Sequence, residues 1–255
     1  MTRDAAGGED LADVLTKGLW DRIMSLPPQK TRPRKAATLI LLDRSGPQAR
    51  VLLGKRHDGH SFMPGVFVFP GGGIEPGDRQ MAVAGALDPV TEAKLMACLQ
   101  RPSPGAARAL ALAAIRETFE ETGLALGVAD YGAPDNPPPG AWSDYAAQGL
   151  FPSLEDVHFI GRAITPPRMK KRYDTFFFAA DSTGIAAKIE GVVGADSELV
   201  ELTWVTLAQA RGLNMPLITS VILRELEARL EKGMSRHLPT PTYRTGRTRW
   251  LRIEA

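Results

Sequence analysis

Three glutamates crowd the end of a stretch that otherwise has the pattern of an amphipathic helix. Glu117, Glu120 and Glu121 are spaced at i, i+3 and i+4, so a helix would project all three carboxylates from one face. Gly123 follows as a C-terminal stop for that helix. Apolar residues recur on the opposite face at three- and four-residue steps, which predicts that the helix packs on a core. These residues are Leu112, Ile115 and Phe119.

The crowding of these carboxylates is electrostatically unfavourable in a helix alone. Anions in the last turns oppose the negative end of the helix dipole at ~0.3–1 kcal/mol each, and they repel one another at this spacing. A solvated surface is the ordinary explanation of a glutamate-rich helix, yet a divalent cation would reverse the sign of each of these terms. Carboxylate oxygens are hard ligands that suit Mg²⁺ or Mn²⁺. The pattern therefore predicts a metal site at Glu117, Glu120 and Glu121.

A run of three glycines, residues 71–73, supplies a second half to this site. It follows the short apolar run 66–69, which predicts a strand, and we expect a turn at the glycines. Without Cβ atoms, the backbone of successive glycines can approach a ligand or a metal closely. The run lacks the Lys-Ser/Thr ending of a nucleotide-binding P-loop, and a triple glycine alone also occurs in ordinary turns.

Together the two halves resemble the Nudix signature. That signature runs as Gly, five residues, Glu, seven residues, and then Arg-Glu-U-x-Glu-Glu-x-Gly-U, where U is apolar. Gly72 opens the pattern here, Asp78 stands at the first acid, and residues 116–124 complete it. Asp replaces the usual Glu, Thr118 occupies the first apolar position, and the 37 residues 79–115 stand where the signature has seven.

The resemblance implies an α/β/α sandwich with a mixed sheet, which agrees with the alternation of expected strands and helices. It also implies hydrolysis of a nucleoside diphosphate linked to another moiety, with Mg²⁺ or Mn²⁺ as cofactor. The three glutamates and the Gly71 carbonyl would hold the metal, and Glu120 or Glu121 would accept the proton of the attacking water, directly or with Glu198. In the family, the signature arginine, here Arg116, pairs with the first acid. Because the acid is shorter here and the insertion is long, the sequence does not decide whether that ion pair forms in this chain.

The long insertion and a Met-Pro-Gly run at 63–65 resemble one Nudix subgroup, the peroxisomal coenzyme A diphosphatases. This resemblance implies coenzyme A or an acyl ester of it as the first candidate substrate. NADH, ADP-ribose and nucleoside triphosphates stay open, because the further motif of the best characterised coenzyme A hydrolases is not evident upstream. A Nudix regulator that binds a nucleotide without cleaving it is an alternative of another class.

Positively charged residues outside the signature are candidates for holding the substrate phosphates. Arg56 follows an expected strand, and Arg168, Lys170 and Arg172 lie together in a basic segment. Arginine can bind a phosphate bidentately, but a solvated strand end or a solvated loop explains these charges equally well. Gly72 is a further candidate contact, because its backbone can approach a ligand.

The chain is expected to form one Nudix domain, residues 36–255, behind an N-terminal extension, residues 1–35. The extension has the pattern of an amphipathic helix, which we expect to pack on the domain or on a second copy of the chain, as in a homodimer. The insertion, about 79–108, is expected to hold a short helix, and the segment 216–255 predicts a helix followed by a basic tail. Strands are expected at residues 37–43, 51–54, 157–163, 175–180 and 202–205.

Composition narrows the classes of function. Hydrophobic residues make up 44% of the chain and charged residues 24%, and the net charge of +2 does not indicate a nucleic-acid or membrane partner. The tail interleaves arginines with Tyr243 and Trp250, as some single-stranded nucleic-acid binders do, but we expect an edge strand or an interface there. No apolar run approaches the ~20 residues of a membrane span, the N-terminus lacks a secretory pattern, and the single Cys98 excludes an internal disulfide. We therefore expect a cytoplasmic enzyme that acts on a small nucleotide.

Overall fold

The structure of the chain is a computed structural model. The expected N-terminal helix lies largely outside the residues that it describes, and so does the methionine of the Met-Pro-Gly run. Within the described part, no helix combines the length and the hydropathy that crossing a membrane requires. The described residues are 23, 25–27, 29, 31–59, 64–246 and 250–254.

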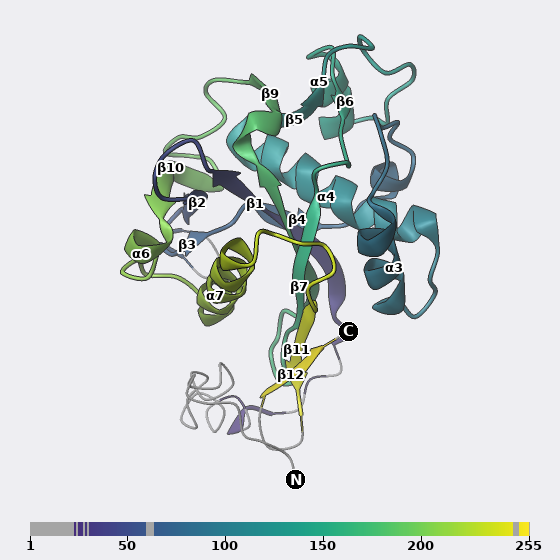
Figure 1. The fold of residues 1–255 in the computed structure, drawn as a ribbon. Helices are drawn as coiled ribbons and strands as arrows, with labels where there is room; N and C mark the ends of the chain where they lie inside the picture. The colour runs from purple at the N-terminus through teal and green to yellow at the C-terminus, as the bar shows by residue number, and fades with distance from the viewer. Residues whose placement is uncertain are drawn as a thin grey trace.

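A large mixed sheet lies at the centre of the described part (Figure 1). Its strands are β1 (Arg34–Asp43), β2 (Arg50–Arg56), β3 (Phe67–Val68), β4 (Gly71–Gly73), β7 (His158–Ile164), β8 (Tyr173–Asp181), β10 (Leu199–Thr206), β11 (Pro241–Thr245) and β12 (Trp250–Glu254). The main order is β10-β2-β1-β8-β7-β11-β12, while β3 pairs with β2 and β4 with β1. Pairing is parallel between β1 and β8 and between β7 and β11, and antiparallel at the other junctions.

A smaller antiparallel sheet and several helices surround this centre. The smaller sheet has the order β6-β5-β9, with β5 (Leu124–Val128), β6 (Phe151–Pro152) and β9 (Ile185–Lys188). The α-helices are α3 (Pro89–Ala97), α4 (Pro104–Thr122), α5 (Ala141–Ala146), α6 (Leu207–Ala210) and α7 (Leu217–Glu231). Two short 3-10 helices are η1 (Pro76–Arg79) and η2 (Ser182–Gly184).

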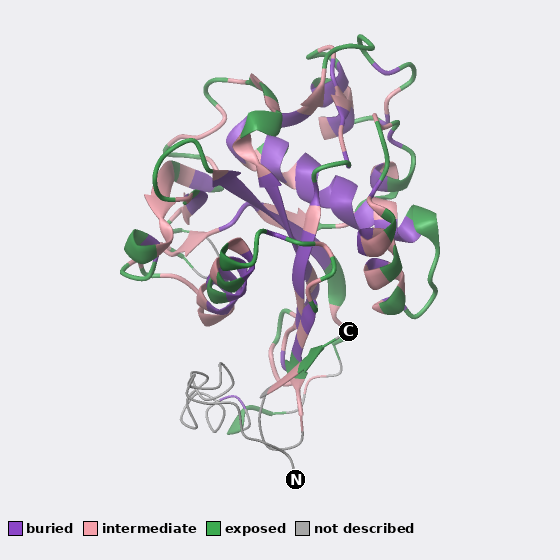
Figure 2. Ribbon diagram, viewed as in Figure 1, coloured by how far each residue is buried: buried purple, intermediate pink, exposed green. Residues whose placement is uncertain are grey.

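Alternate residues of β1 face two different cores. Leu39 and Leu41 belong to a buried cluster with α4, whereas Ile40 and Leu42 belong to a cluster with α7. A strand points successive side chains to opposite faces, so this continuous apolar run requires cover on both sides. Figure 2 shows the central strands and most of α4 as buried. The expected sandwich with a mixed sheet is therefore confirmed.

The signature helix α4 begins inside the stretch 102–105, whose prolines indicate a break in the sequence pattern. Ser103 caps the helix, because its Oγ accepts a hydrogen bond from the amide of Ala106 at 3.1 Å. Pro104 then occupies a position where a helix does not need an N–H. The helix ends at Gly123, whose φ of 75° is the left-handed conformation that favours glycine.

The glycine run is a strand, which corrects the turn expected from the sequence. Strand β4 pairs with β1, with Thr38 opposite Gly71. A Cβ atom on Gly71 would lie 2.5 Å from the carbonyl oxygen of Ala37 and from Thr38 Oγ1, so a larger residue could not pair this closely. The glycines are thereby held between β1 and α4.

The two peripheral segments take ordered places on the fold. The insertion contains α3, which packs on α4. The basic tail forms β11 and β12, and β12 is the last strand in the sheet order, as expected for an edge strand. The division at residue 36 and the homodimer stay predictions.

Candidate active site

Two of the three signature glutamates lie against the glycine strand. The amide of Gly71 donates a hydrogen bond to Glu121 Oε2 at 3.1 Å. Gly72 is so close to Glu117 that a Cβ atom on the glycine would lie 2.5 Å from the carboxylate carbon. Glu120 is more exposed and pairs with Arg116. The fold thus brings the two halves of the signature together.

A buried ion pair joins the first acid of the signature to its arginine. Arg116 Nε donates to Asp78 Oδ1 at 2.8 Å, and the two side chains are 1% and 0% exposed. The amide of Glu75 and the indole of Trp142 also donate to the Asp78 carboxylate, at 2.7 and 2.9 Å. The ion pair between Arg116 and the first acid therefore forms in this chain despite the shorter acid and the long insertion. Sequence reasoning missed Trp142, because no motif or spacing connects it to Asp78.

Arg116 also organises the other members of the site. Its Nη2 donates to the carbonyl of Gly73 at 2.7 Å, and its Nη1 lies 3.0 Å from Glu117 Oε1 and 2.9 Å from Glu120 Oε1. One buried guanidinium thus fixes the glycine strand and two glutamates relative to Asp78. These are the contacts of a positioning residue, and a direct catalytic role for Arg116 stays a prediction.

We compared this architecture with solved structures. A Nudix hydrolase from Alicyclobacillus acidocaldarius is similar to the chain with 28% sequence identity and a TM-score of 0.59, over 78% of this chain and 93% of that chain. The chain has the fold of a Nudix hydrolase. This likeness supports the assignment of the chain as an enzyme, a Nudix pyrophosphohydrolase.

The search of solved structures also matched the MutT protein from Methanosarcina mazei. It has 14% identity and a TM-score of 0.44, over 80% of this chain and 99% of that chain. No family model and no curated protein matches the sequence. The coenzyme A diphosphatase subgroup stays a prediction.

Burial changes the acidity of the Nudix glutamates. Burial raises the pKa of Glu117 to about 7, against the opposing charge of Arg116. The pKa of Glu121 is raised well above its ordinary value by burial and, secondarily, by the negative charges of Glu198 and Glu117. Both groups are therefore costly as anions where they stand, because the protein interior stabilises charge less well than water.

The donor chemistry of these glutamates fits a divalent cation. Carboxylate oxygens are the ligands that Mg²⁺ prefers, and a cation would offset the cost of burying their charge. As the side chains stand, no three His, Cys, Asp or Glu residues of the described part are grouped to hold a metal. Arg116 engages Glu117 and Glu120 in ion pairs. The Gly71 carbonyl stays a predicted ligand.

Arg56 and Glu198, predicted for substrate binding and proton transfer, form an ion pair with each other. Arg56 lies at the end of β2, and Glu198 directly precedes β10, the strand that pairs with β2. Glu198 is within electrostatic range of Glu121, since its charge raises the pKa of that group. The two residues therefore reach the glutamates from the neighbouring strands, and their roles stay predictions.

An apolar cavity of about 610 Å³ opens beside Glu121. Gly71, Glu121, Arg56 and Thr38 form part of its wall. Cavities of this size with a few polar groups commonly bind small molecules. The sequence did not predict the cavity, because its wall is assembled from distant strands and α7. Apolar members of that wall are Phe69, Ile164, Met169, Phe177, Ile218 and Val221.

The basic side chains predicted to hold phosphates are not in the wall of this cavity, although Met169 of the same segment is. Arg168 donates a hydrogen bond to the carbonyl of Leu26 at 2.5 Å, and Arg172 donates to backbone carbonyls as well. Neither these two residues nor Lys170 is in the cavity wall. Phosphate binding by the segment stays a prediction.

Proposed function

We propose that the chain is a Mg²⁺- or Mn²⁺-dependent hydrolase that cleaves the diphosphate bond of a nucleoside diphosphate linked to another moiety. The observation that carries the proposal is the contact of Glu117 and Glu121 with the glycine strand, beside an open cavity. Diphosphate hydrolysis depends mainly on positioning and on stabilisation of negative charge, and this site offers both.

The residues divide the chemistry between them. Glu117, Glu120 and Glu121 would hold the metal, which when bound supplies positive charge for the diphosphate and acidifies water. Glu121 is our candidate for the proton acceptor, because its carboxylate accepts a hydrogen bond from the glycine strand and lies in the wall of the cavity. Glu198, whose charge acts on Glu121, would support that proton transfer. Arg116 keeps the glutamates and the glycine strand in place.

The cavity favours a substrate with an apolar part next to its diphosphate. Its wall beyond the glutamates is largely hydrocarbon, and such a wall stabilises a ligand by removing apolar surface from water. An acyl ester of coenzyme A meets both requirements and is our first candidate. Coenzyme A, NADH, ADP-ribose and nucleoside triphosphates are the competing substrates.

A panel of these compounds, incubated with Mg²⁺ and analysed by chromatography, tests the proposal. We expect hydrolysis at the diphosphate, with the largest kcat/KM for an acyl-coenzyme A, and no hydrolysis in the presence of a chelator. Binding of a nucleotide without turnover of any compound would contradict the hydrolase and favour a regulator.

Replacing Gly72 with Ala is expected to lower kcat/KM by roughly 10²-fold. The new Cβ atom would lie 2.5 Å from the Glu117 carboxylate, so that carboxylate must move, and small displacements of reacting groups cost about this much. Gly73→Ala is the matched control, because a Cβ atom there has nothing within 4 Å. Equal activity of the two variants in steady-state assays would remove Gly72 from the site.

Replacing Ile218 with Asn is expected to raise KM for an acyl-coenzyme A by roughly tenfold while changing KM for ADP-ribose little. Ile218 lines the cavity, and an apolar side chain contributes ~1.5–3 kcal/mol when a ligand buries it fully. Ile253→Asn makes the same change at an exposed position of β12. If KM rises for both substrates alike, the cavity does not select for the apolar part.

A further inference from the structure

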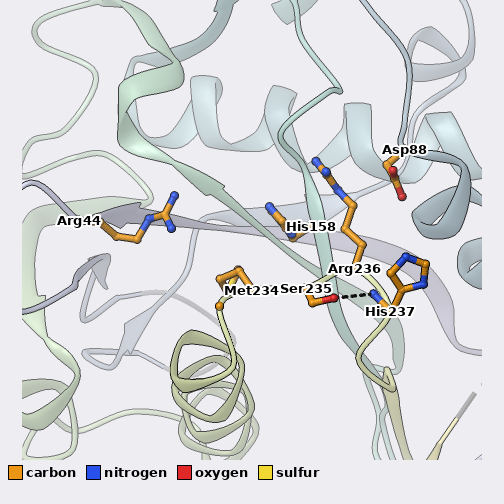
Figure 3. A pocket seen from close by; sticks show the side chains of 8 residues that line it. Arg44, Asp88, His158, Met234, Ser235, Arg236 and His237 are labelled. Carbon is orange, nitrogen blue, oxygen red and sulfur yellow. Dashed lines mark hydrogen bonds between the residues drawn. The ribbon is translucent and has the colours of Figure 1, made fainter.

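A second pocket, of about 440 Å³, lies apart from the glutamates. It shares no lining residue with the apolar cavity. Figure 3 shows Arg44 on one side of its opening, Arg236 and His237 on the other, and His158 between them. Asp88 contributes the carboxylate of the lining.

The Nudix insertion and the segment after α7 build this pocket together. Asp88 caps α3 of the insertion, because its Oδ1 accepts hydrogen bonds from the amides of Val90 and Thr91 at 3.0 and 3.2 Å. Lys94 of the same helix donates from Nζ to the carbonyl of Arg236 at 2.7 Å and to the carbonyl of Leu238. These contacts hold the segment that carries Arg236 and His237 against the insertion.

The pocket carries an excess of positive charge. Its lining holds two guanidinium groups and one carboxylate, that of Asp88, which the helix cap already engages; Arg44 also pairs with Asp181 outside the lining. Arg44 Nε pairs with Asp181 at 2.8 Å, and Arg236 Nη2 donates to the carbonyl of Glu155 at 2.5 Å. These bonds orient the two guanidinium groups, although the Arg44 side chain is 53% exposed. Arg236 Nε is buried and has no hydrogen-bond partner among the described residues, although a guanidinium has five N–H donors.

Several positive charges act on His158 in this pocket. Burial lowers the pKa of His158, and the charges of Arg236, Arg44 and Arg229 lower it further against the opposing charge of Asp156. A neutral imidazole can donate one hydrogen bond and accept another, while the fixed arginines supply the charge. An anion placed here would relieve the repulsion among these cations.

We propose that this pocket binds a phosphate-type oxyanion, held by Arg44 and Arg236 with His158 at its base. Guanidinium groups form bidentate, charge-assisted hydrogen bonds to phosphate oxygens, and the pocket presents two of them from different segments. The site is distinct from the place where the diphosphate is cleaved, and it gives the insertion a binding role.

Calorimetric titration of the full chain with inorganic phosphate, in chelator and at neutral pH, tests this site apart from the metal site. We expect Arg236→Ala and Arg44→Ala each to weaken phosphate binding at least tenfold. Arg224→Ala removes the same charge from an exposed position of α7 and is expected to bind like wild type. Equal affinity of all three variants, or no binding of phosphate by the wild type, overturns the proposal.

Two further experiments identify the source of the oxyanion and locate it at His158. A nucleoside monophosphate titrated beside inorganic phosphate shows whether the oxyanion is free or carried on a nucleotide, and the tighter of the two names the source. In NMR spectra, phosphate is expected to raise the pKa of His158 in the wild type but not in Arg236→Lys, which keeps the charge and loses the bidentate geometry. An unchanged His158 titration in the wild type contradicts the site even if phosphate binds elsewhere.

Discussion

Replacing Glu121 with Gln is expected to lower kcat/KM by roughly 10²–10⁴-fold, the range over which positioned proton acceptors contribute. The amide keeps the size of the side chain but can neither accept the proton nor provide a charged oxygen to a metal. Stability is expected to hold or rise, because burial and neighbouring carboxylates already make the Glu121 anion costly. Steady-state kinetics and thermal unfolding of the purified variant measure both effects.

Glu190→Gln serves as the matched control for this prediction, because it makes the same change in a side chain that is 80% exposed and paired only with Lys188 in the described contacts. Its activity is expected to equal that of the wild type. A Glu121→Gln protein that retains most of its activity would exclude Glu121 both as the proton acceptor and as an essential ligand.

Replacing Asp78 with Ala is expected to destabilise the fold by about 3–5 kcal/mol, the usual cost of leaving a buried charge without its partner. Arg116 is 1% exposed and would lose both of its contacts with Asp78. The indole of Trp142 would lose its acceptor as well. For a chain of this length the change corresponds to a fall in Tm of roughly 6–20 °C, which thermal or urea unfolding measures.

A conservative series distinguishes this ion pair from simple loss of volume. Asp78→Asn keeps the size of the side chain and an acceptor oxygen, and is expected to cost less than Asp78→Ala. Adding Trp142→Phe to each background then measures the coupling between the indole and the carboxylate. If Asp78→Ala unfolds at the wild-type temperature, the pair does not hold the site together.

The signature and the core were predictable because their signals are local. The helical spacing of three glutamates marked Glu117, Glu120 and Glu121 as one group in the sequence. The position of Gly123 after the last turn marked the end of the helix. The apolar run in β1 required cover on both faces, which the two buried clusters supply. Each of these inferences uses the geometry of one element, and the tertiary contacts agree with it.

The features that sequence reasoning missed depend on contacts between distant segments. Trp142 reaches Asp78 across 64 positions, and no local pattern marks it as part of the site. The glycine run became a strand because β1 lies close enough to pair with it, a fact of tertiary structure. Phosphate binding by the basic segment was expected from charge and stays a prediction, and charge alone could not foresee that Arg168 and Arg172 contact backbone carbonyls.

Anomalous scattering from crystals soaked in Mn²⁺ tests the central claim most directly, since it locates the cation without reference to activity. We predict an anomalous peak for manganese within bonding distance of carboxylate oxygens of Glu117 and Glu121, beside Gly71 and Gly72. We also predict that Glu120 leaves Arg116 and becomes a further ligand. A protein that hydrolyses diphosphates while its only ordered manganese lies elsewhere, or that binds none at these glutamates, would contradict the account.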